Sequence, residues 1–309
     1  MSAPISVLIP TFNEQANIEQ CLSSVLGWAT EVFVVDSFST DRTVEIATKM
    51  GAKVVQHQFE GYAEQKNWAM DTLPFGNDWL LILDADEYVT AKSRDEMSAI
   101  ARANGAGFDG FLINRRFVFY GKWIKHCGWY PSWHLRFFKH RMGRYENRPV
   151  DEHVILNGQI GKLQNDLIHR DCRDMDWWIA KHNRYATLNA IAYRQVEDGE
   201  LAAERVRPRL FGTHVERRRF LKERVWRHLP GRGMLFFVYL YIFRLGFLDG
   251  KKGLMFCAMH GVFEQMKVAK HWELKEANNL KPIITKMRVP KDDCLQEWVA
   301  GVGSERETR

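Results

Sequence analysis

Cysteine is scarce in this 309-residue chain. The five cysteines are widely scattered, at Cys21, Cys127, Cys172, Cys257 and Cys294. No CxxC pair occurs, so a zinc knuckle or a redox motif is not expected. The N-terminus MSAPISVLIPTFNE lacks a basic region of the kind that opens an export signal, and its pattern predicts a strand. An odd number of cysteines without such a signal favours a reducing cytosol and free thiols.

The C-terminal third lacks an apolar run long enough to cross a bilayer. Its clean apolar run, Met234 to Phe243, has ten residues, whereas a spanning helix needs about 20. The run follows the strongly basic segment 205–233 and precedes Lys251 and Lys252. These features predict a helix that lies in the membrane interface, where flanking cations hold it to anionic lipid. The alternatives are that these helices cover the flank of the preceding domain or pair two subunits.

Acidic charge is in the minority. The chain has 38 Asp and Glu against 44 Lys and Arg, a net charge of +6 and a pI of about 9.0. A basic surface favours anionic partners such as nucleotides, nucleic acid or an acidic membrane face. The apolar run beside the basic segment favours lipid over nucleic acid, so nucleic-acid binding is not expected. No G-x-G-x-x-G follows the first predicted strand, which disfavours a dinucleotide-binding oxidoreductase.

Short apolar strands alternate with helical patterns through the first hundred residues. Strands are predicted at residues 5–12, 32–35, 52–58 and 79–89, with helices ending near Leu26, Met50 and Leu73. This alternation predicts βαβ units and a mainly parallel sheet of the α/β class. Further along, the pattern predicts a helix at 93–103, β structure at 110–124 and 133–140, and a helix at 174–195.

Carboxylates stand at the ends of two predicted strands. The stretch LLILDADEYV places Asp84, Asp86 and Glu87 directly after an apolar run, and Asp36 ends the second strand. Like charges so close together repel each other, and burying them is expensive unless a positive charge joins them. Mg²⁺ and Mn²⁺ take such oxygen ligands together with substrate phosphates. Since ligands of parallel sheets bind at the carboxyl ends of the strands, these acids predict a metal and nucleotide site.

Other polar residues near the strand ends are weaker candidates. Thr11 and Glu14, after Pro10, are placed to contact a nucleotide, while Asn13 fits a helix cap. Asp36 is placed to bond a uracil or ribose, with helix capping by Ser39, Thr40 or Asp41 as a compatible role. Lys66, with its neighbour Asn67, either approaches a base or phosphate or lies on a solvated helix face.

The middle of the chain offers candidates for an acceptor site. In RPVDEHVILNG, either carboxylate of Asp151 and Glu152 could act as general base, although a surface turn explains the same residues. His169 is by default a buried histidine bonded to backbone, and it becomes a third metal ligand if the fold brings it beside Asp86. Four aromatic residues either line the acceptor side or pack in the core: Trp123, Trp129, Tyr130 and Trp133.

Taken together, the motifs PTFNE, VVDSFSTDRT, EQKN and LDADE resemble family 2 glycosyltransferases of the GT-A fold. The resemblance covers about the first 200 residues. The later segments RFLKERVWR and YIFRLGFLDGKKGL are similar to one branch, the bacterial lipopolysaccharide-core β-glucosyltransferases and related membrane-associated enzymes.

The resemblance implies a UDP-sugar donor, Mn²⁺ or Mg²⁺, and inversion at the anomeric carbon. By position, the nucleoside would be held by Pro10, Thr11, Glu14 and Asp36, with Lys66 near the base or diphosphate. Asp84, Ala85 and Asp86 match the family's DxD, in which the last aspartate is the chief metal ligand, and His169 matches a further ligand in some members. Asp151 and Glu152 both match the base, because DEH stands where the family usually has an ED pair.

The resemblance also sets the expected domains and alternatives. Residues 1–200 would form the GT-A domain, with the donor side at 1–110 and the acceptor side at 111–200. Residues 201–290 would form a basic, amphipathic helical extension at the cytoplasmic face of the inner membrane, and residues 291–309 a polar tail. One alternative is a transferase that passes sugar to a polyprenyl phosphate. Another is a non-catalytic, nucleotide-binding membrane adaptor.

Overall fold

The computed structural model describes residues 2–146, 153–197, 211, 226, 229 and 231–279. The described chain divides into two compact units. The first contains residues up to 125 together with 129–173, and the second contains His126–Gly128 together with the residues from Asp174 onward. The sequence predicts a domain boundary at residue 200. In the structure the boundary lies after Arg173, because the helix Met175–Glu197 belongs to the second unit.

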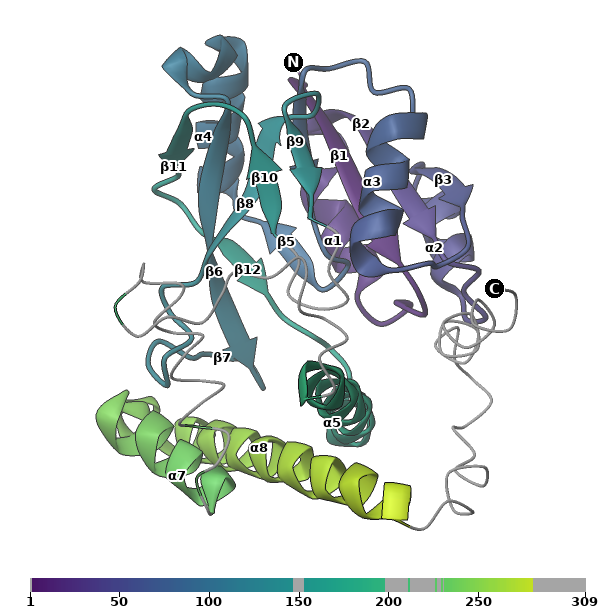
Figure 1. Cartoon of the computed structure of the whole chain (residues 1–309). Coiled ribbons are helices and arrows are strands. Elements are labelled where there is room, and N and C mark those ends of the chain that lie inside the picture. The colour runs from purple at the N-terminus through teal and green to yellow at the C-terminus, as the bar shows by residue number, and fades with distance from the viewer. Residues whose placement is uncertain are drawn as a thin grey trace, which may run out of the picture. The chain divides into compact units, whose positions relative to one another are not determined.

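The first unit contains a curled, mostly parallel sheet (Figure 1). Its parallel half has the order β3-β2-β1-β4, formed by β1 (Ala3–Thr11), β2 (Ala29–Asp36), β3 (Lys53–Gln56) and β4 (Trp79–Ile82). These are the four apolar runs that predicted strands. Their carboxyl ends meet at one edge, which brings Thr11, Asp36 and the turn after β4 together.

The other half of the sheet is mixed. Its order continues from β4 through β8 (Trp133–Lys139), β6 (Gly110–Phe119), β12 (Leu167–His169) and β5 (Glu87–Val89). The short strands β7 (Lys122–Trp123) and β11 (Ile160–Lys162) pair with β6, while β9 (Gly143–Tyr145) and β10 (Val154–Leu156) form a separate antiparallel pair.

The single strand predicted over residues 79–89 is wrong. The chain turns after β4, where the amide of Glu87 donates to the carbonyl of Asp84 at 2.9 Å. β5 then pairs with β12 in antiparallel register, so that Glu87 lies opposite His169. The acidic motif therefore occupies a tight turn between two strands that belong to distant parts of the sheet.

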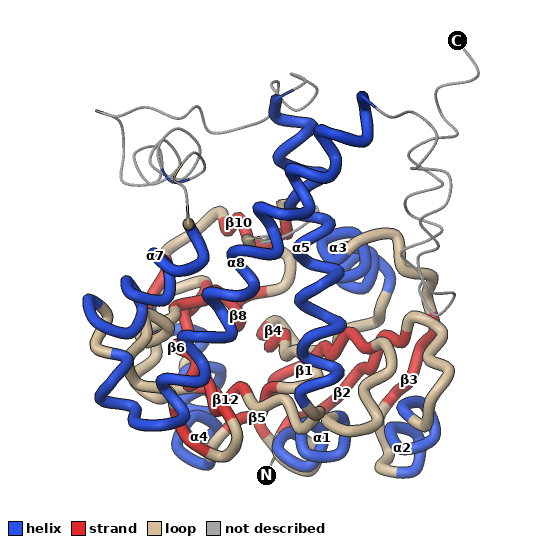
Figure 2. Tube along the Cα trace, turned by 90° about the horizontal axis from the view of Figure 1, so that it is seen from below, coloured by secondary structure: helices blue, strands red, loops and turns tan. Residues whose placement is uncertain are grey.

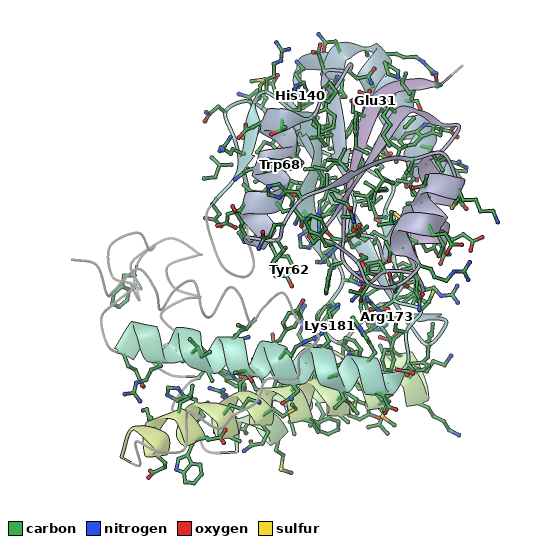
Figure 3. The ribbon with its side chains drawn as sticks, turned by 90° about the vertical axis from the view of Figure 1, so that its right-hand side faces the viewer. Glu31, Tyr62, Trp68, His140, Arg173 and Lys181 are labelled. Carbon is green, nitrogen blue, oxygen red and sulfur yellow. The ribbon has the colours of Figure 1, made fainter. Side chains whose placement is uncertain are left out.

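Helices cover both faces of the sheet. On one face, α1 (Ile18–Val25), α2 (Thr43–Lys49) and α4 (Ala91–Arg102) pack on the buried side chains of β1 and β4. On the other face, α3 (Tyr62–Thr72) packs with β9 and β10. The apolar positions of α1 recur at residues 18, 21, 22 and 25, the spacing of one helix face. Trp68 of α3, which is labelled in Figure 3, stacks on His57 with ring centroids 3.8 Å apart.

The second unit is helical. It consists of α5 (Met175–Glu197), α7 (Arg232–Val238), a π-helical turn η4 (Tyr239–Phe243), a 3₁₀ turn η5 (Gly246–Asp249) and α8 (Gly250–Asn279). The helices α5 and α8 lie side by side (Figure 2). The predicted apolar run is thus α7 with η4, and it ends where Leu245 adopts a positive φ of 56°.

The segment His126–Gly128 belongs to this helical unit because of Asp249. The buried carboxylate of Asp249 accepts a hydrogen bond from the backbone amide of His126 at 2.9 Å and contacts its Nδ1 at 3.2 Å. The amide of Cys127 donates to the carbonyl of Arg244 at 3.0 Å. The thiols of Cys127 and Cys257 lie 3.4 Å apart. Asp249, in the stretch FLDG, therefore holds the segment His126–Gly128 between β7 and β8 through these hydrogen bonds.

Candidate functional site

Two loops at the ends of β1 and β2 are tied together around Asp36. Its buried carboxylate accepts hydrogen bonds from the Thr11 hydroxyl at 3.2 Å, the Ser39 amide at 2.9 Å and the Gln56 side chain at 3.2 Å. Asn13, which fitted a helix cap in the sequence, instead accepts a bond from the Thr40 amide at 2.9 Å. Asp36 is therefore held by hydrogen bonds at the sheet edge where the sequence predicts a nucleoside site.

Asp84 lies in the turn after β4 and is held by arginine. The guanidinium of Arg136, from β8, donates to both carboxylate oxygens of Asp84 at 3.2 and 2.6 Å. Burial alone would raise the pKa of Asp84, but the charges of Arg136 and Lys66 hold that pKa well below its usual range. The fully buried Glu87 accepts from Arg115 at 3.0 Å. The negative charges of Asp84 and Glu87 are thus balanced in part by Arg136 and Arg115.

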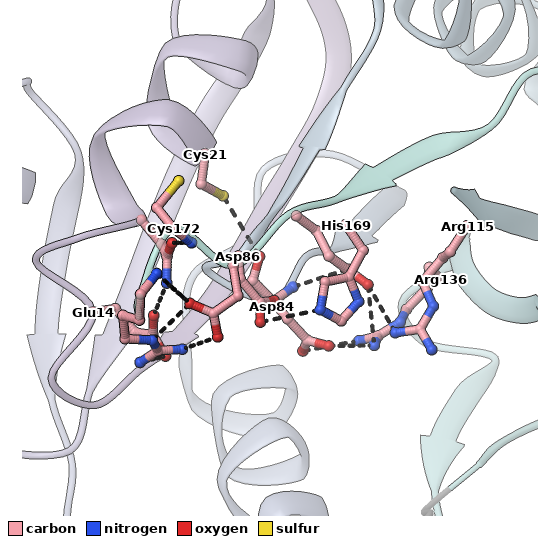
Figure 4. Close-up of polar contacts among 12 residues, drawn as sticks. Glu14, Cys21, Asp84, Asp86, Arg115, Arg136, His169 and Cys172 are labelled. Atoms are coloured by element: carbon pink, nitrogen blue, oxygen red, sulfur yellow. Dashed lines mark hydrogen bonds and ion pairs between the residues drawn. The ribbon is translucent and has the colours of Figure 1, made fainter. Parts of the chain in front are cut away.

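Asp86 faces a different partner, His169 at the end of β12 (Figure 4). The Nε2 atom of His169 lies 3.3 Å from the Asp86 carboxylate, and the Arg170 amide donates to the Asp86 carbonyl at 2.9 Å. Burial lowers the pKa of His169, but the neighbouring carboxylate of Asp86 outweighs burial, so the pKa is raised. The structure therefore places His169 beside Asp86, which is the condition under which the sequence makes His169 a candidate for a third metal ligand.

Glu14 meets the residues that follow β12. Its carboxylate contacts Arg173 at 3.1 Å, and Arg173 also pairs with Asp171 at 2.8 Å (Figures 3 and 4). The Asn17 side chain donates to both Glu14 and Asp171, at 2.8 and 3.2 Å. These contacts link the loop after β1 to the segment after β12, on either side of the Asp86 turn.

A cavity of about 210 Å³ adjoins Arg136. Its polar lining is cationic or neutral in the described residues, and the hydroxyl of the buried Tyr145 has no hydrogen-bond partner there. The ammonium of Lys66 lies 4.8 Å from the centroid of the Tyr145 ring. Burial, reinforced by Arg115 and Arg136, lowers the pKa of His134 to about 3. The side chains that line the cavity include Lys66, Trp133, His134, Arg136, Tyr145 and His153.

The four aromatic candidates lie in different surroundings. Trp133 is partly exposed and lines the cavity, with the Lys162 ammonium 5.2 Å from its ring centroid. Trp123 contacts the Arg116 guanidinium at 4.5 Å, and the Tyr130 hydroxyl donates to Asp166 at 3.1 Å. Trp129 packs on Phe117. Only Trp133 among the four lines this cavity.

The two candidates for the base, Asp151 and Glu152, lie outside the described residues. The described chain stops at Glu146 and resumes at His153, and the amide of Glu146 donates to the carbonyl of His153 at 3.0 Å. His153 lines the cavity. The described residues on either side of Asp151 and Glu152 in the sequence, Glu146 and His153, are therefore hydrogen-bonded to each other, and His153 lies at the cavity.

The metal candidates form a pair of side chains and not a closed site. Among the described residues no group of three His, Cys, Asp or Glu side chains is arranged to hold a metal ion. Asp86 and His169 supply one carboxylate and one imidazole, while the carboxylate of Asp84 is paired with Arg136. Mn²⁺ and Mg²⁺ commonly use one or two carboxylates and complete their shell with substrate phosphates and water, so the donor set fits such an ion.

Several residues of the site were missed from the sequence. Arg136, Arg115 and Arg173 were not singled out, nor was Tyr145. The signal was present for Arg136, because an arginine stood between apolar residues in WHLRFFKH, at a position that a buried strand would otherwise fill with an apolar side chain. For Tyr145 and Arg173 no local pattern pointed to the site, since their roles follow from strand pairing.

Comparison with known proteins finds a family match for the part of the chain that contains Asp36, Asp84 and Asp86. Residues 6–154, just under half of the chain, match the family model described as Glycosyl transferase family 2. This stretch therefore resembles a family 2 glycosyltransferase domain. An uncharacterized glycosyltransferase of Rickettsia bellii is 46% identical over 100 residues, which is 32% of this chain and 33% of that protein. A second, from Rickettsia conorii, is 43% identical over 100 residues, covering 32% of this chain and 35% of that protein. The chain thus spans about a third of the length of these relatives.

The fold of the family 2 domain also has a solved counterpart. The mannosyltransferase PcManGT from Pyrobaculum calidifontis, in complex with GDP-Man and Mn²⁺, has a TM-score of 0.52 at 15% identity. The similarity covers 89% of this chain and 88% of that one. The predicted GT-A fold is confirmed by the curled sheet and this likeness. The lipopolysaccharide-core branch stays a prediction.

Proposed function

We propose that the chain is an inverting, metal-dependent glycosyltransferase. It moves a hexose from a UDP-sugar to a hydroxyl of a bacterial envelope glycolipid or polysaccharide such as lipopolysaccharide core. One observation carries the proposal: Asp86, in the turn after β4 and within the stretch that matches the family 2 model, lies 3.3 Å from His169 at the end of β12. A metal and a nucleotide-sugar bound to a protein of the same fold support it.

The donor would lie along the carboxyl ends of β1, β2 and β4. Asp36, already oriented by Thr11 and Ser39, would bond the ribose or uracil. Lys66 is buried, and its charge acts on Asp84, which supports its assignment to the base or the diphosphate. Pro10, near the end of β1, and Ala85, in the turn after β4, would supply backbone contacts to the donor.

Asp86 and His169 would hold Mn²⁺ or Mg²⁺. When bound, such an ion offsets the charge that develops on the UDP leaving group. The carboxylate of Asp84 is paired with Arg136, so in this proposal Asp86 is the chief carboxylate ligand and Asp84 a secondary one.

The acceptor would enter the cavity beside Arg136. Trp133 offers an aromatic face for a sugar ring, with Trp123, Trp129 and Tyr130 further along the same segment. Asp151 or Glu152 would take the proton from the acceptor hydroxyl. The hydroxyl oxygen then attacks the anomeric carbon as the bond to the diphosphate breaks, and attack from the opposite face inverts the configuration.

One observation favours a second candidate, transfer to a polyprenyl phosphate. The described residues that line the cavity include Lys66, Arg136 and His153 but no carboxylate. A phosphate acceptor is already ionised and needs no base. The double variant Asp151→Asn/Glu152→Gln separates the two candidates, because it would abolish transfer to a hydroxyl and spare transfer to a phosphate. Release of UDP, measured with each acceptor class, is the readout.

The donor site is tested by thermal unfolding with a panel of UDP- and GDP-sugars, with and without Mn²⁺. A ligand that binds only the folded state at about a hundred times its dissociation constant stabilises by about 2.7 kcal/mol. We expect a UDP-sugar to raise the melting temperature only with metal, and Asp86→Asn to remove the effect. Asp95→Asn, an exposed change on α4, is the control. Stabilisation that survives in Asp86→Asn contradicts the assigned ligand. Stabilisation without any turnover would favour the adaptor.

A further inference from the structure

The second unit exposes large apolar side chains on α7, η4, η5 and α8. Monomeric soluble proteins rarely expose extended apolar patches, and those that occur mark interaction sites. Met234 is 75% exposed and Phe243 is 73% exposed. The other large apolar side chains that are more than half exposed on α7, η4, η5 and α8 are Trp272, Leu248, Ile242, Val262 and Met255.

The same unit buries ionisable side chains. Arg232 is 2% exposed and Glu264 is 5% exposed, and they pair at 2.9 Å between α7 and α8. Lys267 also pairs with Glu264. Asp249 and His260 are equally buried. Along α8 the ionisable side chains of His260 and Glu264 are thus buried together with Phe256 and Cys257, while the apolar side chains of Met255 and Val262 are more than half exposed. Helix pairs in lipid place their ionisable side chains toward one another in this way.

Cationic side chains flank the turns η4 and η5, residues 239–249, which form the apolar tip of this helix pair. Arg244, Lys251 and Lys252 are exposed, and the one acidic residue between Gly231 and Lys252 is the buried Asp249. Exposed charge at the tip is therefore of one sign. Lysine and arginine beside an apolar segment are attracted to a membrane surface that carries anionic lipid.

The two helices approach closely and bend. A Cβ atom at Gly233 would lie 2.6 Å from the carbonyl oxygen of Gly261, so the backbones of α7 and α8 are in contact there. Small residues at helix crossings are typical of helix pairs in membranes. No single helix in the described ranges has the length and apolar composition of a membrane span. Residues 232–243 and 246–276 meet those criteria only as a pair, with a bend of 75° between them.

We propose that residues 232–272, the apolar hairpin, insert into one leaflet of a membrane that contains anionic lipid. The tip at Phe243 and Leu248 contacts acyl chains, while Lys251 and Lys252 lie at the phosphate level. The bend keeps the hairpin at interfacial depth, so it does not cross the bilayer. The inference rests on the surface of the helical unit and does not depend on the proposed transfer reaction.

Flotation of the full-length protein with lipid vesicles tests the proposal. We expect binding to vesicles of phosphatidylcholine with phosphatidylglycerol and much weaker binding to phosphatidylcholine alone. Lys251→Gln/Lys252→Gln should reduce partitioning onto the anionic vesicles by roughly thirtyfold, since each cation near such a surface contributes about a factor of five. Phe243→Ser/Leu248→Ser should reduce binding to both kinds of vesicle.

The matched control is Lys49→Gln/Lys92→Gln, which removes two exposed lysines from α2 and α4 of the first unit and should leave binding unchanged. Circular dichroism melts establish that each variant is folded. If the control weakens binding as much as Lys251→Gln/Lys252→Gln, the attraction is general and the assigned surface is wrong. A dimer without lipid that Phe243→Ser/Leu248→Ser dissociates, with no vesicle binding, would make a second copy the occupant and overturn the proposal. Bound protein should be released by alkaline carbonate, and retention after that wash would overturn interfacial insertion in favour of a span.

Discussion

Replacing Arg136 with methionine tests whether the acidic turn is held by buried charge. Arg136 is 9% exposed at its side chain and donates to both oxygens of Asp84. Removal of one partner of a buried ion pair costs about 3–5 kcal/mol, because the other charge is left uncompensated. The Asp84 side chain is 34% exposed, and Arg115 still pairs with Glu87, so we expect the lower end, about 3 kcal/mol.

The matched control is Arg144→Met. Arg144 donates to both oxygens of Asp71 at 2.9 Å, the same bidentate geometry, but the two side chains are 61% and 55% exposed. Exposed pairs contribute at most about 1 kcal/mol. Urea denaturation of the natural chain and both variants measures the difference. Equal losses in the two variants would refute the view that burial makes the Arg136 pair important.

The pH dependence provides a second test of the same pair. The pKa of Asp84 in the folded state lies below that of the unfolded chain, so the pair contributes its full stability above about pH 4. That contribution is lost as pH falls through the folded-state pKa. The stability difference between the natural chain and Arg136→Met should therefore narrow below about pH 4. A difference that widens on acidification would contradict the assignment.

Three other predictions concern stability. Asn67→Ala removes two hydrogen bonds to the backbone of Tyr145, at 3.0 and 2.9 Å, and should cost about 1–3 kcal/mol in urea denaturation. Gly233→Ala places a methyl group against the backbone of Gly261 and should lower the melting temperature by overpacking, at a cost of about 1–3 kcal/mol. Burial lowers the pKa of His260 to about 3, so protonation favours the unfolded chain. Stability is lost as pH falls from about 6.5 toward 3, by up to about 1.4 kcal/mol per pH unit, and His260→Gln should flatten that slope.

The parallel half of the fold was predictable because its signal is local. Four apolar runs of strand length alternate with amphipathic helices, and β1 to β4 formed where those runs occur. The predicted helices near Leu26, Met50 and Leu73, and those at 93–103 and 174–195, are also present. The acids at strand ends follow from the same pattern, because parallel strands share one carboxyl edge.

The rest of the site depends on pairing between distant residues. The turn at Asp84 was missed because Val89 continues the apolar pattern, and only pairing with Leu167 shows that β5 belongs elsewhere. Arg136 reaches Asp84 because β8 lies beside β4, an order that no local pattern contains. The sequence did not predict that Asp86 and His169 are in contact. It predicted only that His169 would be a candidate metal ligand if the fold brought the two residues together.

The anchoring of His126–Gly128 by Asp249 makes the two units hard to separate. Within the described residues the chain passes between them at three places, after Lys125, after Gly128 and after Arg173. A fragment cut at Arg173 would keep the short segment but lose Asp249 and Cys257, its partners. Residues 1–173 are therefore a poor expression fragment, although they include the whole family 2 match. Two of the three crossings, after Lys125 and after Gly128, flank the short segment between Trp123 and Trp129, so any cut on either side of this segment separates it from one of the two units.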